Sequence, residues 1–226
     1  MDNFLAILND VIGELKSILF DVKTASKPAV TEVPQSVQPA EKDLKPFFDV
    51  VRKEIFKRGL KQSQVDGIKA KLAVFEREGF PLSWQAYALA TSYHETAGRM
   101  QPVREGLSAS DTWRKKNLRY YPYYGRGDVQ LTWKENYQKA AKELGIPELA
   151  TDLDLALDPT ISAEIMARGM KEGWFSRGHS LPNHLPNKEG TREEFRQSRR
   201  IINLMDKADL IADYALVFQE ALRKVL

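Results

Sequence analysis

Two glutamates ten residues apart are the side chains whose type and spacing best suit catalysis. Glu95 ends the mostly apolar stretch WQAYALATSYHET, and Glu105 follows in the turn-rich stretch QPVREG. At the C-terminal end of a buried helix, desolvation and the helix dipole would both raise the pKa of Glu95. A raised pKa suits a general acid near neutral pH. A solvated glutamate at a helix end explains Glu95 equally well.

Two carboxyl groups facing each other could act as acid and base on a glycosidic bond. Their separation would be about 6.5–9.5 Å in an inverting enzyme and about 5–5.5 Å in a retaining one. The sequence does not give this distance. On spacing alone, an ion pair between Glu105 and either Arg104 or Arg99 is the simpler explanation of Glu105.

Histidine and cysteine usage argues against a metal centre. A metalloprotease helix would need a second histidine three residues after Glu95, where the chain has Gly98. Cysteine is absent, and His179 and His184 lie far along the chain. We therefore expect no metal centre.

An aromatic segment, YYPYYGRGDVQLTW (residues 120–133), could form a wall on which sugar rings stack. A cluster packed in the core is the alternative. Gln130 and Thr132 lie on the same face of this segment if it is extended, and both could hold a water or a substrate amide. Thr132 is also a candidate helix cap, with Glu135 completing a capping box.

Three segments together resemble the family 19 glycoside hydrolases, and the closer resemblance is to the chitinase-like endolysins of bacteriophages. They are HETAGRMQPVREG, YYGRGDVQLTWKENY, and RRIIN followed by DKADLIADYALVFQEAL. The similarity covers about residues 46 to 224. It implies a mostly α, lysozyme-like fold in which a small β-hairpin lines the cleft.

The resemblance also implies roles for individual residues. Glu95 matches the catalytic acid, and Glu105 stands in the PxRE position of the phage-type enzymes as the base. The remaining matches are positions that hold substrate or the attacking water, or lie beside them: Gln130, Thr132, Asn136, Asn203, Tyr124 and Arg126.

Two positions depart from the family pattern. In the plant chitinases the second carboxylate lies roughly two dozen residues after the first, so Asp111 remains an alternative base. The position of Asp128 is usually aromatic or proline, and we expect this carboxylate to perturb the cleft or to face solvent.

The implied function is that of an endolysin that hydrolyses β-1,4 bonds of peptidoglycan with inversion, so glycan strands are the expected partner. The implied reaction needs neither a metal nor an organic cofactor. Such an enzyme would be made in the host bacterial cytoplasm and act on the wall after release. A chitinase is the alternative. A third possibility is a virion-associated wall-degrading component, or a catalytically silent one, anchored by its N-terminal helix.

That helix is expected in residues 1–23, where apolar residues recur every three or four positions from residue 3. Its apolar face predicts packing on the protein's own body, self-association or docking to another protein. Its acidic polar face disfavours an anionic membrane, and no basic region of the kind that begins a signal peptide stands near the start. A proline-containing linker (residues 24–43) and a catalytic domain (residues 44–226) are expected to follow.

Within the domain, capping and breaking residues predict a series of helices. The first spans residues 46–58. Others are expected to begin after Ser63, Ser83, Thr132, Asp158 and Thr191, and the last spans residues 208–225. Residues 120–131 are expected to form a hairpin or an irregular loop, and residues 178–190 a long loop.

Charge is divided unevenly between the two parts of the chain. Its formal net charge of +3 does not point to a nucleic-acid binder. Residues 1–43 carry four lysines and seven acidic residues, whereas the remainder carries thirty basic and twenty-four acidic residues. The predicted domain therefore has a net charge of +6, which suits a polyanionic wall.

Overall fold

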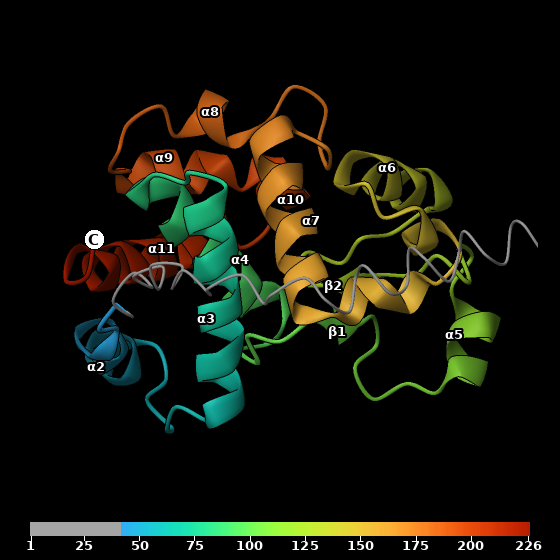
Figure 1. The fold of residues 1–226 in the computed structure, drawn as a ribbon, viewed down its shortest axis with the longest axis horizontal. Coiled ribbons are helices and arrows are strands. Elements are labelled where there is room, and N and C mark those ends of the chain that lie inside the picture. The colour runs from blue at the N-terminus through green and yellow to red at the C-terminus, as the bar shows by residue number, and fades with distance from the viewer. Residues whose placement is uncertain (1–41) are drawn as a thin grey trace, which may run out of the picture. The chain divides into compact units, whose positions relative to one another are not determined.

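Helices dominate the computed structural model, which describes residues 42–226 (Figure 1). The predicted helix within residues 1–23 and almost all of the predicted linker lie outside the described residues. The helices in chain order are α2 (Lys45–Glu54), α3 (Gln62–Arg77), α4 (Leu82–Glu95), α5 (Asp111–Asn117), α6 (Lys134–Leu144), α7 (Pro159–Glu172), α8 (Leu181–His184), α9 (Arg192–Ser198), α10 (Arg200–Asn203) and α11 (Ala208–Arg223). Two 3-10 helices, η1 (Pro147–Ala150) and η2 (Leu153–Leu157), lie between α6 and α7.

The core is built around α4, which packs along α11. Ten of the 14 residues of α4 are buried. Several are alanines, such as Ala86 and Ala90, and α11 contributes Ala212 and Ala215. Small side chains on both helices let their backbones approach closely, and burial of this apolar surface stabilises the pair. Helices α2 and α9 also pack on α11.

The β structure is a two-stranded antiparallel sheet. Strand β1 (Val103–Arg104) pairs with β2 (Arg126–Gly127) in the register Val103↔Gly127. An isolated bridge joins Arg126 to Leu131. The expected β element of residues 120–131 is therefore present in part, but its main partner is β1, more than twenty residues earlier. In Figure 1 α5 lies at the periphery, between the two strands in sequence.

Two of the predicted helix starts are confirmed by side-chain caps. Asp158 accepts hydrogen bonds from the backbone N–H groups of Thr160 and Ile161, and Thr191 forms a capping box with Glu194. Both motifs satisfy N–H groups that a helix start leaves unpaired.

Three predicted caps are wrong. Helix α3 begins after Lys61 instead of Ser63, and α4 after Pro81 instead of Ser83, whose hydroxyl donates to the Asn187 carbonyl (2.7 Å). Helix α6 begins after Trp133, because the hydroxyl of Thr132 donates to the carbonyl of Gln130 (2.7 Å). In each case the side chain that could have capped a helix is used elsewhere or lies inside the first turn.

Other element boundaries also differ from expectation. Helix α2 ends at Glu54, and the chain turns through residues 55–59 to Gly59 (φ 103°), so the predicted extension to residue 58 is wrong. Helix α5, capped by the Ser110 hydroxyl, was not predicted. No helix in residues 42–226 is both long and apolar enough to cross a membrane.

Candidate active site

Glu95 is the last residue of α4, at the point where this buried helix ends. Its side chain is 18% exposed, whereas Ser92 one turn earlier is fully buried. The hydroxyl of Thr96 donates to the Ser92 carbonyl (2.7 Å) and accepts from the Met100 N–H (3.0 Å), which fixes the helix end. The helix thus carries the carboxyl group of Glu95 from the core to the surface.

A buried arginine is the charged partner of Glu95. Arg199 Nη1 lies 2.8 Å from Glu95 Oε1, and the arginine side chain is 1% exposed. Its Nε also donates to the Asp206 carbonyl (2.8 Å), so the guanidinium is held from two sides. Sequence reasoning missed this partner, because nothing in RRIIN indicates which arginine is buried.

Two groups beside this ion pair have shifted pKa values. Burial raises the pKa of Tyr87, whose hydroxyl donates to the Ser198 carbonyl (2.7 Å) and so ties α9 to α4. Burial lowers the pKa of His94, and the negative charge of Glu95 opposes that shift. Tyr87 is therefore a neutral donor that holds the segment next to Arg199, and His94 is mainly neutral at pH 7.

Glu105 follows β1 and is held by donors at both carboxylate oxygens. Oε1 accepts from the Tyr120 hydroxyl (2.6 Å), and Oε2 accepts from the Gly125 N–H (2.9 Å). The backbone N–H of Glu105 also donates to the Gly125 carbonyl (2.7 Å), which extends the pairing of β1 with β2. The second carboxylate is therefore fixed by the aromatic segment that follows it.

The simpler ionic explanation of Glu105 is wrong. Arg104 pairs with Asp154 instead, and Arg99 makes no ion pair with Glu105 among the described contacts. The hydrogen bond to Glu105, with burial as a second cause, raises the pKa of Tyr120 to about 12. Tyr120 therefore keeps its proton and donates to Glu105 throughout the neutral range.

Gln130 contacts both strands of the sheet beside Glu105, whereas the Thr132 hydroxyl donates to the Gln130 carbonyl. Gln130 has a left-handed backbone (φ 55°), and its Nε2 donates to the carbonyls of Val103 (3.1 Å) and Gly127 (3.2 Å). A Cβ on residue 125 would lie 2.7 Å from Gln130 Oε1, so a larger residue in place of Gly125 would displace the Gln130 amide. The amide of Gln130 thus braces β1 against β2. Its role toward a water or substrate stays a prediction.

Tyr124 and Arg126, in the same aromatic segment, are buried. The guanidinium of Arg126 stacks 3.7 Å from the centre of the Tyr124 ring. Its Nε donates to Asp154 (2.8 Å), and its Nη1 donates to the Pro122 carbonyl (3.0 Å). Burial by itself would raise the pKa of Asp154, but hydrogen bonds from Arg126 and Arg104 outweigh it, and the pKa is lowered. The aromatic segment is thus partly a packed cluster, as the alternative interpretation proposed.

The two predicted asparagines lie in different surroundings. Asn136, in the first turn of α6, is half-buried, and its Nδ2 donates to the Thr132 carbonyl (2.8 Å). Asn203 is exposed at the end of α10, four residues after Arg199. The site residues therefore form two groups. One is the Glu95–Arg199 ion pair, with the Asn203 N–H donating to the Arg199 carbonyl (3.0 Å), and the other surrounds Glu105.

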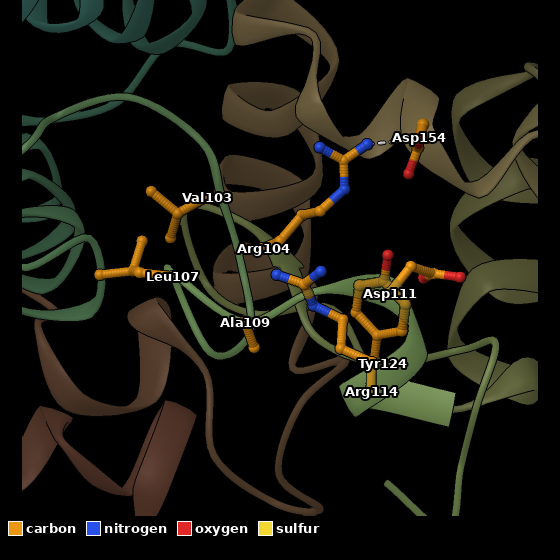
Figure 2. Close-up of a pocket in the computed structure, with 8 residues that line it drawn as sticks. All are labelled: Val103, Arg104, Leu107, Ala109, Asp111, Arg114, Tyr124 and Asp154. Carbon is orange, nitrogen blue, oxygen red and sulfur yellow. Dashed lines mark hydrogen bonds and ion pairs between the residues drawn. The ribbon is translucent and has the colours of Figure 1, made fainter. Parts of the chain in front are cut away.

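A pocket of about 620 Å³ opens beside the second group (Figure 2). Its lining comes from β1, the following loop, α5, the aromatic segment and η2, and includes Arg104, Asp111, Arg114, Tyr124 and Asp154. The alternative base, Asp111, is exposed, and its carboxylate accepts from the Tyr121 hydroxyl (2.9 Å). Asp111 thus lies at the pocket, whereas the carboxylate of Glu105 is bound to Tyr120 and Gly125.

The expectation that Asp128 faces solvent is wrong. Its side chain is fully buried and pairs with the equally buried Lys71 at 2.8 Å. The hydroxyls of Ser92 and Ser162 each donate to the carboxylate at 2.7 Å. Lys71 also donates to the Met100 carbonyl (2.9 Å). This buried cluster joins α4, which carries Glu95, to the segment that carries Gln130.

The described residues contain no group of three His, Asp or Glu side chains that could hold a metal ion. His179 and His184 contact each other, with Nδ1 and Nε2 2.9 Å apart. Burial is the main cause that lowers the pKa of His184, and the charge of His179 lowers this pKa further.

Comparison with known proteins finds similarity to chitinases over part of the sequence. Over 75 residues the chain is 39% identical to Chitinase 5 of Oryza sativa subsp. japonica and 37% identical to Endochitinase EP3 of Arabidopsis thaliana. These alignments cover 30% of this chain, 26% of the first relative and 27% of the second. The chain therefore spans about a quarter of the length of the curated relatives it matches. No family model matches the chain.

Solved structures extend the similarity to most of the chain. Chitinase C from Streptomyces griseus HUT6037 has a TM-score of 0.54 at 19% identity, covering 79% of this chain and 75% of its own. A mutant of chitinase C has a TM-score of 0.51 at 18% identity, and the match covers 82% of this chain and 96% of that one. The described domain has the fold of these chitinases. The mostly α fold with a small β element is thereby confirmed, and the sequence relatives confirm the resemblance to chitinases over part of the chain.

Proposed function

We propose that this chain is a glycoside hydrolase that cleaves β-1,4 bonds between aminosugars, with peptidoglycan as its substrate. The way in which each of its two candidate carboxylates is held supports this proposal most directly. Glu95 leaves a buried helix beside a buried arginine, and Glu105 is held at both oxygens by Tyr120 and Gly125. A pair of positioned carboxyl groups is what glycosidic hydrolysis requires.

In the proposed reaction Glu95 gives its proton to the glycosidic oxygen as the bond from that oxygen to the anomeric carbon breaks. Glu105 takes a proton from a water that attacks the opposite face of the sugar, which inverts the configuration. Arg199 balances the negative charge left on Glu95. Tyr120 and the Gly125 N–H orient Glu105 toward the water. Glu95 then takes up a proton from solvent and Glu105 releases one, which returns both side chains to their starting states.

Charge favours peptidoglycan over chitin as the substrate. Chitin is neutral, whereas peptidoglycan carries carboxylates on its peptide stems, and residues 44–226 have a net charge of +6. We propose that the protein is a phage endolysin, made in a bacterial host and acting on its wall. The chitinase alternative is favoured by the sequence relatives, which are chitinases.

Digestion of purified peptidoglycan and of chitin, with mass analysis of the new reducing ends, tests the proposal. We expect new reducing ends on muramic acid or glucosamine residues of peptidoglycan, formed faster than those of chitin at equal bond concentration. Faster cleavage of chitin would favour the chitinase alternative. Absence of new reducing ends from both polymers would contradict hydrolase activity.

The assignment of the base predicts different effects for two carboxylates. Replacement Glu105→Gln should lower turnover about 100-fold or more, because general base catalysis contributes roughly that factor. Replacement Asp111→Asn should leave turnover within about threefold of the wild-type value, since this side chain lies at the pocket rim and is bound by Tyr121. Initial rates of reducing-end formation measure both effects. A large loss in Asp111→Asn with an active Glu105→Gln would make Asp111 the base.

A further inference from the structure

A basic concave surface lies on the chain immediately after Glu95. Two neighbouring pockets, of about 480 and 460 Å³, share Lys61, Gln64, Ala97 and Gly98 in their linings. The cations of the two linings are Lys57, Arg58, Lys61 and Arg99, which we call the basic surface. No acidic residue lines either pocket.

The four cations of the basic surface are exposed, and none of them pairs with an acidic side chain in residues 42–226. Asp66, the next acidic residue along α3, accepts a hydrogen bond from Gln62 (2.8 Å). Four cations gathered without counter-charges repel one another, and an anionic ligand would relieve that repulsion. Elsewhere in the domain many arginines are paired, as Arg192 is with Asp209 and Asp213.

The pockets are held in shape by contacts between α3 and the loop after α4. Gln64 Nε2 donates to the Gly98 carbonyl (2.7 Å), and Gln101 Nε2 donates to the Ser63 carbonyl (2.5 Å). The first turn of α3 borders the pockets and has no side-chain cap at Lys61, so the positive end of its dipole adds to the basic charge. The surface is therefore preformed for an anion.

The basic surface lies close to the proposed acid. Ala97, in both linings, is two residues after Glu95, so the two Cα atoms lie within about 7 Å of each other. A polymer long enough to extend past both Glu95 and these pockets could place its substituents in them. Neutral chitin offers no charge there, whereas the peptide stems of peptidoglycan carry carboxylates.

We propose that the basic surface binds peptide-stem carboxylates of the glycan strand being cleaved, and so selects peptidoglycan over neutral aminosugar polymers. This inference rests on the proposed function and adds a determinant of specificity to it. The cations act on substrate binding and take no part in proton transfer. Their contribution should decrease as salt screens the charges.

Replacement Lys61→Gln/Arg99→Gln tests the inference, with Lys142→Gln/Arg177→Gln as a control that removes the same charge elsewhere. The substrates are peptidoglycan freed of phosphate polymers and the same material with its carboxylates converted to amides. At low salt we expect the test variant to cleave native peptidoglycan about tenfold more slowly, because two of the four cations that attract the stem carboxylates are removed. On amidated peptidoglycan it should match the wild type. The control should match the wild type on both.

A binding assay separates failure of this inference from failure of the proposed function. In a Glu95→Gln background, retention on sedimented native peptidoglycan should fall about tenfold when Lys61 and Arg99 are replaced, and retention on amidated peptidoglycan should not change. Equal retention of test and control variants on native peptidoglycan would overturn the inference even if the protein is a hydrolase. An equal loss on native and amidated material would overturn it too. Normal binding selectivity without any cleavage by the wild type would instead contradict the proposed function.

Discussion

Replacement Glu95→Gln is expected to lower the rate of glycosidic bond cleavage about 100-fold to 10,000-fold, the range that a general acid contributes. The amide has nearly the size of the carboxyl group, and its oxygen can still accept from Arg199, which lies 2.8 Å from Glu95 Oε1. It has no acidic proton to give to the leaving oxygen. Initial rates of reducing-end formation from peptidoglycan measure the loss.

A control separates this loss of chemistry from a loss of fold. Glu76, on the exposed side of α3, supplies the same substitution away from the site, and Glu76→Gln should keep full activity. Glu95→Gln should retain the helical circular dichroism spectrum of the wild type. If Glu95→Gln kept wild-type rates, Glu95 would not be the acid.

Of the replacements proposed here, Lys71→Met is expected to cause the largest loss of stability, about 3–5 kcal/mol in the free energy of unfolding. It leaves the carboxylate of Asp128 fully buried without its cation, which lies 2.8 Å away in the native protein. Two serine hydroxyls remain as donors, but they carry no opposite charge. For a domain of this size the melting temperature should fall by about 10 °C, as measured by calorimetry.

Two further variants test the cause of that loss. Lys115→Met, on the exposed α5, should change the melting temperature by less than about 2 °C. The double variant Lys71→Met/Asp128→Leu should recover part of the stability, because no unpaired charge then remains buried. A double variant less stable than Lys71→Met would contradict this account of the buried pair.

The sequence predicted those elements whose signals are local. Asp158 with Pro159, and Thr191 with Glu194, are capping patterns that depend only on neighbouring residues, and both caps form. The apolar stretch before Glu95 predicted the buried α4 for the same reason. Ser83 shows the limit of such signals, because its hydroxyl bonds to Asn187, more than a hundred residues away. Helix α5 was missed because its seven residues are mostly polar or charged.

The partners of the charged groups depend on tertiary structure and could not be predicted from local patterns. Arg199 meets Glu95 only because α9 and α4 both pack on α11. Lys71 meets Asp128 across α3 and the turn after β2. Nothing in the spacing of these residues indicates that they are adjacent. The positions of Glu95 and Glu105 could be inferred, but the groups that hold them could not.

The stereochemistry of the first product tests the central claim most directly. In proton NMR spectra recorded during the first minutes of cleavage of a β-1,4-linked aminosugar oligomer with peptide stems, the new reducing end should appear first as the α anomer. The β anomer should then grow by mutarotation, because a water activated by Glu105 attacks the face opposite the bond that Glu95 protonates. First appearance of the β anomer, or no new anomeric signal at all, would contradict an inverting hydrolase built on these two carboxylates.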